Sequence, residues 1–417
     1  MPKIHAMKRI ALFCAVAAAL ACKETAQAPA APAVAVPDKI LVAATLPIGS
    51  KEGEAARFIR EGYELAFEEA NRGGGVFIGG KQVPLQLDIL DDADDPARGV
   101  ALLRASKARF FLGSSSARVI DAEAAFAEQE GAPYVVAVGA SNDVFARGAH
   151  FVFGLQAPLE SLAYTQMRWI DEQQKAHRLP SPLSVALLVE DGARGREFRK
   201  GVIDFTEKTA SRRLSYKVVF DETFPPAQQD FTAQLARLKA AGADAFLSDS
   251  SLAEFMALHR QYLLRGLCHK VLSYGAHGIE PDALEAFGFD GLGYILSAVW
   301  WSNRLAKSGL ARRFAETFKD TYHREPDWYG ALSYEAARVL IEALRKSEST
   351  ARGAVRERLV AGKMDSILPG GRLVFGADQQ ATYPYVVQQN QPDGSTPMIY
   401  PNDVAETPGV ASNPKCK

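Results

Sequence analysis

The chain has 417 residues, of which 47% are apolar and 23% charged, with 48 lysines and arginines against 49 aspartates and glutamates. This length allows two or three ordinary domains with full cores. A charge balance near zero removes the electrostatic argument for a nucleic-acid partner, and no apolar run reaches the roughly eighteen residues of a transmembrane helix.

The N-terminus has the layout of an export signal. Lys3, Lys8 and Arg9 precede an apolar run at residues 10–21, and small residues then lead to Cys22. We therefore expect residues 1–22 to be a signal peptide. The end of the run, Ala-Leu-Ala-Cys, also resembles a bacterial lipobox, which implies lipidation of Cys22 and attachment to a membrane.

A tether and a pair of cysteines are two further features of the sequence. Residues 23–37 are rich in Ala and Pro without periodicity, as expected of an extended tether. Cys268 and Cys416 could pair in an oxidising compartment, but two cysteines do not define a disulfide framework. Their pairing is left open.

Strands and helices alternate from residue 39 onward. Apolar runs and helical spacing predict a strand at 39–46, a helix that ends at 71–75, a strand at 83–89, a helix at 96–107 and a strand at 109–112. This order is that of an open, doubly wound α/β sheet.

Two small-residue turns, at 113–116 and 139–142, follow neighbouring strands of this pattern. The carboxyl ends of parallel strands face a crevice, where hydroxyls and backbone N–H groups can hold a small ligand. The helix that follows the first turn would favour an anion at its N-terminus. For any single residue, an ordinary turn or N-cap is the alternative.

The strand–helix pattern then repeats through residue 274, which predicts a second lobe of similar size. The sequence then predicts further elements that neither lobe needs for its own core: helices at 304–322 and 328–346 and short strands at 372–375 and 385–388. We therefore expect the chain to cross between the lobes three times. The predicted division is 38–155 plus 299–368 for lobe 1, 156–298 plus 369–401 for lobe 2, and 402–417 as a flexible tail.

Catalytic and metal-binding motifs are missing from the sequence. Residues 75–81 match the outline of a P-loop, yet Gln82 stands where Ser or Thr must bind magnesium. No Gly-x-Ser-x-Gly motif occurs, and the histidines lack the spacing of zinc ligands. The acidic residues at 91–95 are interpreted as an exposed turn and N-cap. The sequence predicts no enzyme, no metal and no cofactor.

At this point several short motifs, in this order, resemble the leucine/branched-chain amino-acid-binding family of type I periplasmic binding proteins: residues 70–75 (ANRGGG), 91–96 (DDADDP), 139–142 (GASN), 230–232 (DFT) and 334–337 (YEAA). The resemblance covers residues 39–401. It implies two α/β lobes with a three-crossing hinge, a small-molecule solute held in the cleft, and delivery to the permease subunits of an ABC importer by a monomeric periplasmic protein. A sensor of the same fold, feeding a signalling partner, is the alternative.

The resemblance also implies site residues. The turns of lobe 1 that grip a carboxylate fall on Ser115 or Ser116, Gly139, Ala140 and Ser141. In lobe 2, Arg194 stands where the family has an aromatic residue, and His277 stands where it has an acidic one. Ser251 and Tyr329 are further candidates for contact with the ligand.

Arg194 and His277 set the expected ligand preference. Arg194 could instead belong to a solvated basic face, and His277 could be an ordinary turn residue. If both face the cleft, they predict an anionic or strongly hydrogen-bonding ligand without a free amine, and weak binding of leucine.

Overall fold

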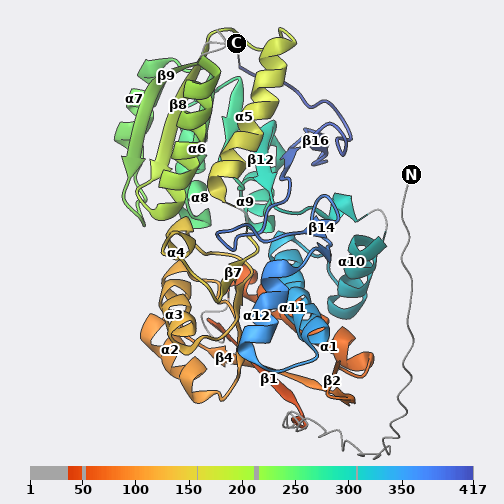
Figure 1. Cartoon of the computed structure of the whole chain (residues 1–417). Coiled ribbons are helices and arrows are strands. Elements are labelled where there is room, and N and C mark those ends of the chain that lie inside the picture. The colour runs from red at the N-terminus through yellow and green to blue at the C-terminus, as the bar shows by residue number, and fades with distance from the viewer. Residues whose placement is uncertain (1–35, 49–52, 157, 211–215, 307–308, 417) are drawn as a thin grey trace, which may run out of the picture. The chain divides into compact units, whose positions relative to one another are not determined.

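A computed structural model describes residues 36–48, 53–156, 158–210, 216–306 and 309–416. Within these ranges the chain forms one five-stranded and one seven-stranded sheet, each covered by helices (Figure 1), and two small two-stranded sheets. None of the helices in these ranges combines the length and the apolar character that a membrane crossing requires. The predicted signal peptide, Cys22 and the tether up to residue 35 lie outside the described residues.

The five-stranded sheet has the order β4-β1-β5-β6-β7, and its strands run parallel. In register, Ile40 of β1 pairs with Leu85 of β4, and Val42 pairs with Phe110 of β5. The inner strands β1 and β5 are apolar and almost wholly buried, as a parallel sheet between helices requires, whereas the edge strand β4 is only partly buried. Their bounds are β1 Ile40–Leu46, β4 Leu85–Asp91, β5 Phe110–Leu112, β6 Tyr134–Val136 and β7 Val152–Gly154.

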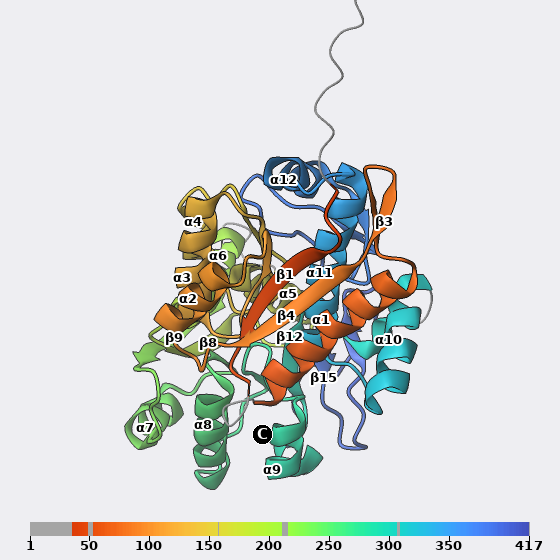
Figure 2. The same ribbon diagram turned by 90° about the horizontal axis from the view of Figure 1, so that it is seen from below.

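Helices cover both faces of this sheet, as the view from below shows (Figure 2). Ala43 and Phe111 join the core under α2 and α3, whereas Val42 and Leu112 join the core under α1 and α11. Successive strand residues thus face different cores. The bounds are α1 Glu54–Arg72, α2 Pro96–Ala105, α3 Ala117–Glu130, α4 Asn142–Ala146 and α11 Trp328–Ser347, with a hairpin of β2 Val76–Ile78 and β3 Lys81–Val83.

The seven-stranded sheet has the order β16-β15-β12-β11-β10-β8-β9. Its strands from β12 to β9 are parallel, and the late strands β15 and β16 add antiparallel edges. The strand bounds are β8 Leu183–Glu190, β9 Tyr216–Phe224, β10 Ala245–Asp249, β11 Val271–Ser273, β12 Ile295–Val299, β15 Val386–Gln389 and β16 Met398–Tyr400. The helices between them are α5 Leu159–Lys175, α6 Ala193–Ala210, α7 Thr232–Ala241, α8 Leu252–Leu264 and α9 Pro281–Leu292.

After β12 the chain returns to the first sheet. A short 3-10 turn at Asn303–Leu305 leads to α10 Gly309–Tyr322, α11 and α12 Arg352–Ala361, and then to the two-stranded sheet of β13 Met364–Asp365 and β14 Arg372–Leu373. Helix α11 packs closely on α1, because a Cβ atom on Gly62 would lie 2.5 Å from the carbonyl oxygen of Gly330. The first sheet's core therefore depends on residues more than 250 positions apart in the sequence.

The chain passes between the two sheets at three places: between β7 and α5, between β12 and α10, and between α12 and β15. The first and third passages lie side by side. The N–H of Gly154 donates to Gln379 (3.0 Å), and the N–H of Ala381 donates back to Gly154 (2.8 Å). We call the elements on the five-stranded sheet lobe 1 and those on the seven-stranded sheet lobe 2. We keep the predicted residue boundaries of the lobes as a proposal. The positions of the three passages support it.

The segment predicted to be a flexible tail, 402–417, is instead fastened to lobe 2 up to residue 416. Cys416 forms a disulfide with Cys268, the pairing that the sequence left open. The N–H of Asn413 donates to Lys270 (2.8 Å), and the N–H of Val410 donates to the side chain of Gln389 (2.7 Å). Apart from the possible disulfide, these contacts could not be predicted from the sequence, because the tail carries no regular hydrophobic pattern of its own.

Candidate functional site

A cavity of about 400 Å³ lies where the two lobes meet, and its lining includes most of the predicted site residues. From lobe 1, Ser115 of the first turn and Gly139, Ala140 and Ser141 of the second turn line it. Ser116 does not; it is the residue that precedes α3 as its N-cap. The βαβ unit thus brings its two turns together, as predicted.

Inner residues of these turns are oriented by buried groups. The hydroxyl of Ser114 donates to Asp92 (2.7 Å), and both side chains are fully buried. The prediction of an exposed turn is therefore wrong for Asp92. The prediction of an N-cap is confirmed, because Asp95 caps α2 by accepting from the N–H of Arg98 (3.0 Å). The N–H of Gly139 donates to the side chain of Gln156 (2.5 Å), which also lines the cavity.

Lobe 2 contributes Arg194, Ser251 and His277 to the lining, and Tyr329 comes from α11. Arg194 lies in the first turn of α6, not in a loop. Its Nη2 donates to Oδ1 of Asp249 (3.0 Å), and its Nε lies 2.7 Å from Oδ2 without hydrogen-bond alignment. The guanidinium is therefore paired with a carboxylate that is fully buried.

Asp249 ends strand β10, and the fold makes room for it. Gly275 has φ +68°, and a Cβ atom there would lie 2.0 Å from Oδ1 of Asp249, so another residue would displace the carboxylate. Burial raises the pKa of Asp249, while Arg194 and His277 act in the opposite direction. The backbone of lobe 2 thus leaves space for the ion pair of Arg194 and Asp249.

His277 is buried and both of its ring nitrogens are engaged. Nδ1 contacts the carboxylate of Glu280, and Nε2 lies 2.9 Å from the carbonyl oxygen of Ser250. Each ring nitrogen thus faces an oxygen acceptor. Burial would raise the pKa of Glu280, but His277 lowers it below its ordinary value. His277 is therefore held in place by Glu280 and the backbone of Ser250.

Two carboxylates that the sequence reasoning missed also line the cavity. Glu190 ends strand β8 and accepts from the N–H of Ser251 (3.2 Å). Glu197, one turn beyond Arg194 on α6, accepts from the N–H of Asn142 across the gap between the lobes (2.8 Å). The position of Glu190 directly after a buried strand was the available signal; Glu197 offered none, because it looks like one more polar residue of a helix.

Burial raises the pKa of both carboxyl groups. For Glu190 the nearby Glu254 adds to the effect, and the N–H of Ser251 and then Arg194 oppose it. Burial raises the pKa of Glu197 to about 7 against the opposing hydrogen bond from Asn142. The expectation of a cationic half-site made by Arg194 and His277 is therefore wrong, because both cations have buried acidic partners and further carboxylates face the cavity.

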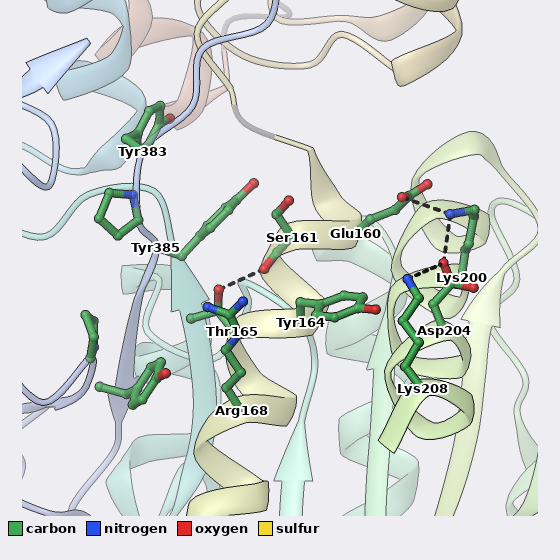
Figure 3. Close-up of a pocket in the computed structure, with 13 residues that line it drawn as sticks. Glu160, Ser161, Tyr164, Thr165, Arg168, Lys200, Asp204, Lys208, Tyr383 and Tyr385 are labelled. Carbon is green, nitrogen blue, oxygen red and sulfur yellow. Dashed lines mark hydrogen bonds and ion pairs between the residues drawn. The ribbon is translucent and has the colours of Figure 1, made fainter. Parts of the chain in front are cut away.

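A second cavity, of about 590 Å³, lies over α5 (Figure 3). Its charged side chains largely neutralise one another: Nζ of Lys200 lies 3.0 Å from Glu160 and 3.1 Å from Asp204. Tyr164 and Tyr385 add aromatic rings to its lining. The turns of lobe 1 do not reach it, so we take the cavity between the lobes as the candidate site. Among the described residues, no group of three or more His, Cys, Asp or Glu side chains is arranged to hold a metal ion.

Two α/β lobes joined by three passages, with a cavity where they meet, form the architecture of proteins that hold a small molecule between two lobes. A model of the periplasmic binding protein family matches residues 39–395, and the chain belongs to this family. This membership implies a periplasmic location. The family comprises solute-binding proteins, and the predicted type I fold is confirmed.

Curated relatives support the predicted resemblance to the branched-chain amino-acid-binding branch. Leu/Ile/Val-binding protein homolog 7 of Brucella abortus (strain 2308) is 23% identical over 368 residues, which cover 86% of this chain and 90% of the relative. Homolog 8 of the same strain is 25% identical over 363 residues, covering 82% and 86%.

Solved structures share the fold. The leucine binding protein LivK of Thermotoga maritima has a TM-score of 0.70 at 20% identity, covering 86% of this chain and 97% of its own. A solute binding protein of an ABC transporter from R. palustris, in complex with benzoate, has a TM-score of 0.69 at 19% identity, covering 90% and 96%.

Proposed function

We propose that this protein is the solute-binding component of an ABC importer, capturing an amino-acid-like or other small polar solute between its lobes and closing on it. The observation that carries the proposal is the cavity of about 400 Å³, which collects hydroxyls and backbone groups from lobe 1 and charged groups from lobe 2. Such a cavity has the size and composition of a small-molecule site.

The proposed ligand contacts are the predicted residues that line this cavity, together with Glu190 and Glu197. The known relatives widen the range of solutes to test, because one solved structure of this fold is described as leucine binding and another holds benzoate. Likeness of fold alone does not make leucine or benzoate a ligand of this protein.

The remaining parts of the proposal concern partners and location. We propose that the permease subunits of an importer receive the solute, that the protein acts as a monomer, and that lipidation of Cys22 holds it at a membrane. The tether would let the folded lobes reach a permease from that anchor. In the described part of the chain, no feature favours a sensing role over transport.

A thermal-shift screen tests the proposal. Purified protein is heated with amino acids, amines, amides, aliphatic carboxylates and aromatic acids, and each stabilising solute is confirmed by calorimetry. Binding stabilises the folded state by an amount that grows with the logarithm of the ligand concentration, so a true ligand raises the melting temperature as its concentration increases. Ala140→Trp should abolish the shift by filling the cavity, whereas Ala101→Trp, on the exposed side of α2, should preserve it. No confirmed solute in any class would argue against a solute-binding role.

A further inference from the structure

The charged groups around the cavity do not balance. Arg194 is paired with Asp249 at 2.7 and 3.0 Å, and His277 contacts Glu280. These two pairs cancel. Glu190 and Glu197 then remain as carboxylates that line the cavity, so lobe 2 presents net negative charge to whatever lies there.

Nearby cations are already committed to other acids. Arg196, which follows on α6, lies 3.5 Å from Asp191. Lys200, one turn further, lies 3.0 Å from Glu160 and 3.1 Å from Asp204. Within the described residues, neither Glu190 nor Glu197 has a lysine, arginine or histidine nitrogen at ion-pair distance.

The lobe 1 side supplies no compensating charge. Ser115, Gly139, Ala140, Ser141 and Gln156 line it there, and all of them are uncharged. Tyr329 adds a phenol whose pKa is raised by burial above its ordinary value, so it stays neutral near pH 7. The negative charge of lobe 2 is therefore unopposed across the cavity.

Each of the two carboxylates also has an oxygen to offer. Glu190 uses Oε2 to accept from the N–H of Ser251, and Glu197 uses Oε1 to accept from the N–H of Asn142. Their other oxygens make no hydrogen bond within the described part of the chain. A donor bound between the lobes could reach these oxygens, and a charged donor makes the stronger hydrogen bond to a carboxylate.

Resting on the proposed function, we propose that the ligand of this cavity is a solute of net positive charge, whose amine or guanidinium group lies against Glu190 and Glu197. The hydroxyls and amides of lobe 1 hold its remaining polar groups. A neutral zwitterion or a simple carboxylate would leave the excess negative charge of the site uncompensated.

The raised pKa values of the two glutamates are consistent with this assignment. The pKa of a carboxyl group rises where burial is not matched by nearby positive charge. The pKa values of Glu190 and Glu197 are both raised in this way. Three charged groups near Glu197 bear on the same balance: Glu160 on α5 and Asp143 on α4 raise its pKa, and Arg194 lowers it. A bound cation would supply the missing charge.

Calorimetry at pH 8 with defined probes tests the assignment. L-Arginine, L-lysine, agmatine and putrescine are compared with L-leucine and benzoate. At least one of the cationic probes should bind about tenfold or more tightly than both leucine and benzoate. Glu190→Gln and Glu197→Gln keep the hydrogen bond to the backbone N–H but remove the charge, and each should weaken that probe about tenfold or more.

A matched control lies on the same helix. Glu207→Gln removes one negative charge from an exposed position of α6 and should leave binding unchanged. Melting curves show whether each variant is folded, and the preference of the unaltered protein needs no variant at all. Tighter binding of leucine or benzoate than of every cationic probe overturns the inference and leaves the solute-binding role standing. Failure of all solutes in the broad screen overturns that role itself.

Discussion

Glu123 is a fully buried carboxyl group in lobe 1, behind the serine-rich turn. The hydroxyls of Thr45 (2.6 Å) and Tyr134 (2.8 Å) donate to its two oxygens, and Tyr63 donates to the carbonyl oxygen of Gly113 beside it (2.9 Å). Burial raises the pKa of Glu123 from 4.5 to about 7, despite these hydrogen bonds. The folded state therefore binds this proton more tightly than the unfolded chain does.

A pH-dependent stability follows from that difference. Because the folded pKa is the higher one, the contribution of Glu123 is fully present below pH 4.5 and is lost as the pH rises toward about 7. The loss is on the order of 3 kcal/mol. In urea unfolding between pH 5 and 8, Glu123→Gln should flatten the decline, whereas Glu357→Gln at an exposed position should not. An unchanged slope in Glu123→Gln would mean that the carboxyl is ionised at little cost.

The pair of Arg194 and Asp249 predicts a non-additive pair of substitutions. Arg194→Ala leaves a fully buried carboxylate without its cation, which costs on the order of 3 kcal/mol of unfolding free energy. Adding Asp249→Ala should recover part of that loss, so a double-mutant cycle by chemical denaturation should give a coupling energy well away from zero. Simple addition of the two single effects would mean that the pair is not coupled.

At this scale, the sequence predicted the residues whose role is local and missed those whose role depends on a distant partner. Ser115, Gly139 and Ser141 belong to turns that follow strands, so their place could be predicted from the pattern. Arg194 lies on helix α6, and its partner Asp249 is 55 residues away on strand β10, so nothing in either local pattern connects them. The predicted ligand preference treated Arg194 as an unpaired charge, whereas the structure pairs it with Asp249.

The packing of α1 on α11 shows how an element depends on one small residue. A Cβ atom on Gly62 would meet backbone atoms of α11, 2.5 Å from the oxygen of Gly330 and 2.8 Å from the nitrogen of Tyr334. Backbone cannot rotate aside as a side chain can, so the helices would have to separate.

Gly62→Ala should therefore destabilise the protein by about 1–3 kcal/mol, although alanine favours helix. Gly353→Ala is the matched control, because a Cβ atom there meets nothing within 4 Å and the residue also lies in a helix. Thermal unfolding should show a lower melting temperature for the first variant and an equal or higher one for the second. Equal melting temperatures for all three proteins would show that α1 can move away without cost.

Elements with a clean hydrophobic period were predicted, and those whose period is interrupted were not. Strand β1, predicted at 39–46, and helix α11, predicted at 328–346, appear close to their predicted bounds. Helix α9 was missed because Gly288, with φ 60° and ψ 173°, breaks it in two. Strand β12 follows it directly and was hidden in the same stretch.

At the scale of the molecule, the lobes are joined at three passages of the chain. Two of these passages are held together at Gly154, and the hydroxyl of Tyr383 adds a hydrogen bond to Leu155 (2.7 Å). On the far side of the cavity the contact between the lobes includes the single hydrogen bond from Asn142 to Glu197 (2.8 Å). A solute bridging both lobes would favour the closed arrangement.

Small-angle scattering should then show contraction when the protein is saturated with a confirmed solute. Ala140→Trp, in which the cavity is filled, should give the same profile with and without that solute. Identical profiles for the unaltered protein at saturation would mean that binding occurs without domain motion.

The order in which the lobes take their segments from the chain has a consequence for biogenesis. Lobe 1 is incomplete until α10, α11 and α12 have been made, and lobe 2 is incomplete until β15, β16 and Cys416 have been made. Chains made or moved N-terminus first usually finish one domain before the next begins. Here lobe 1 cannot close its core until residue 361 has emerged, and lobe 2 cannot be fastened until Cys416 has, so most of the chain must be made before either lobe can fold completely.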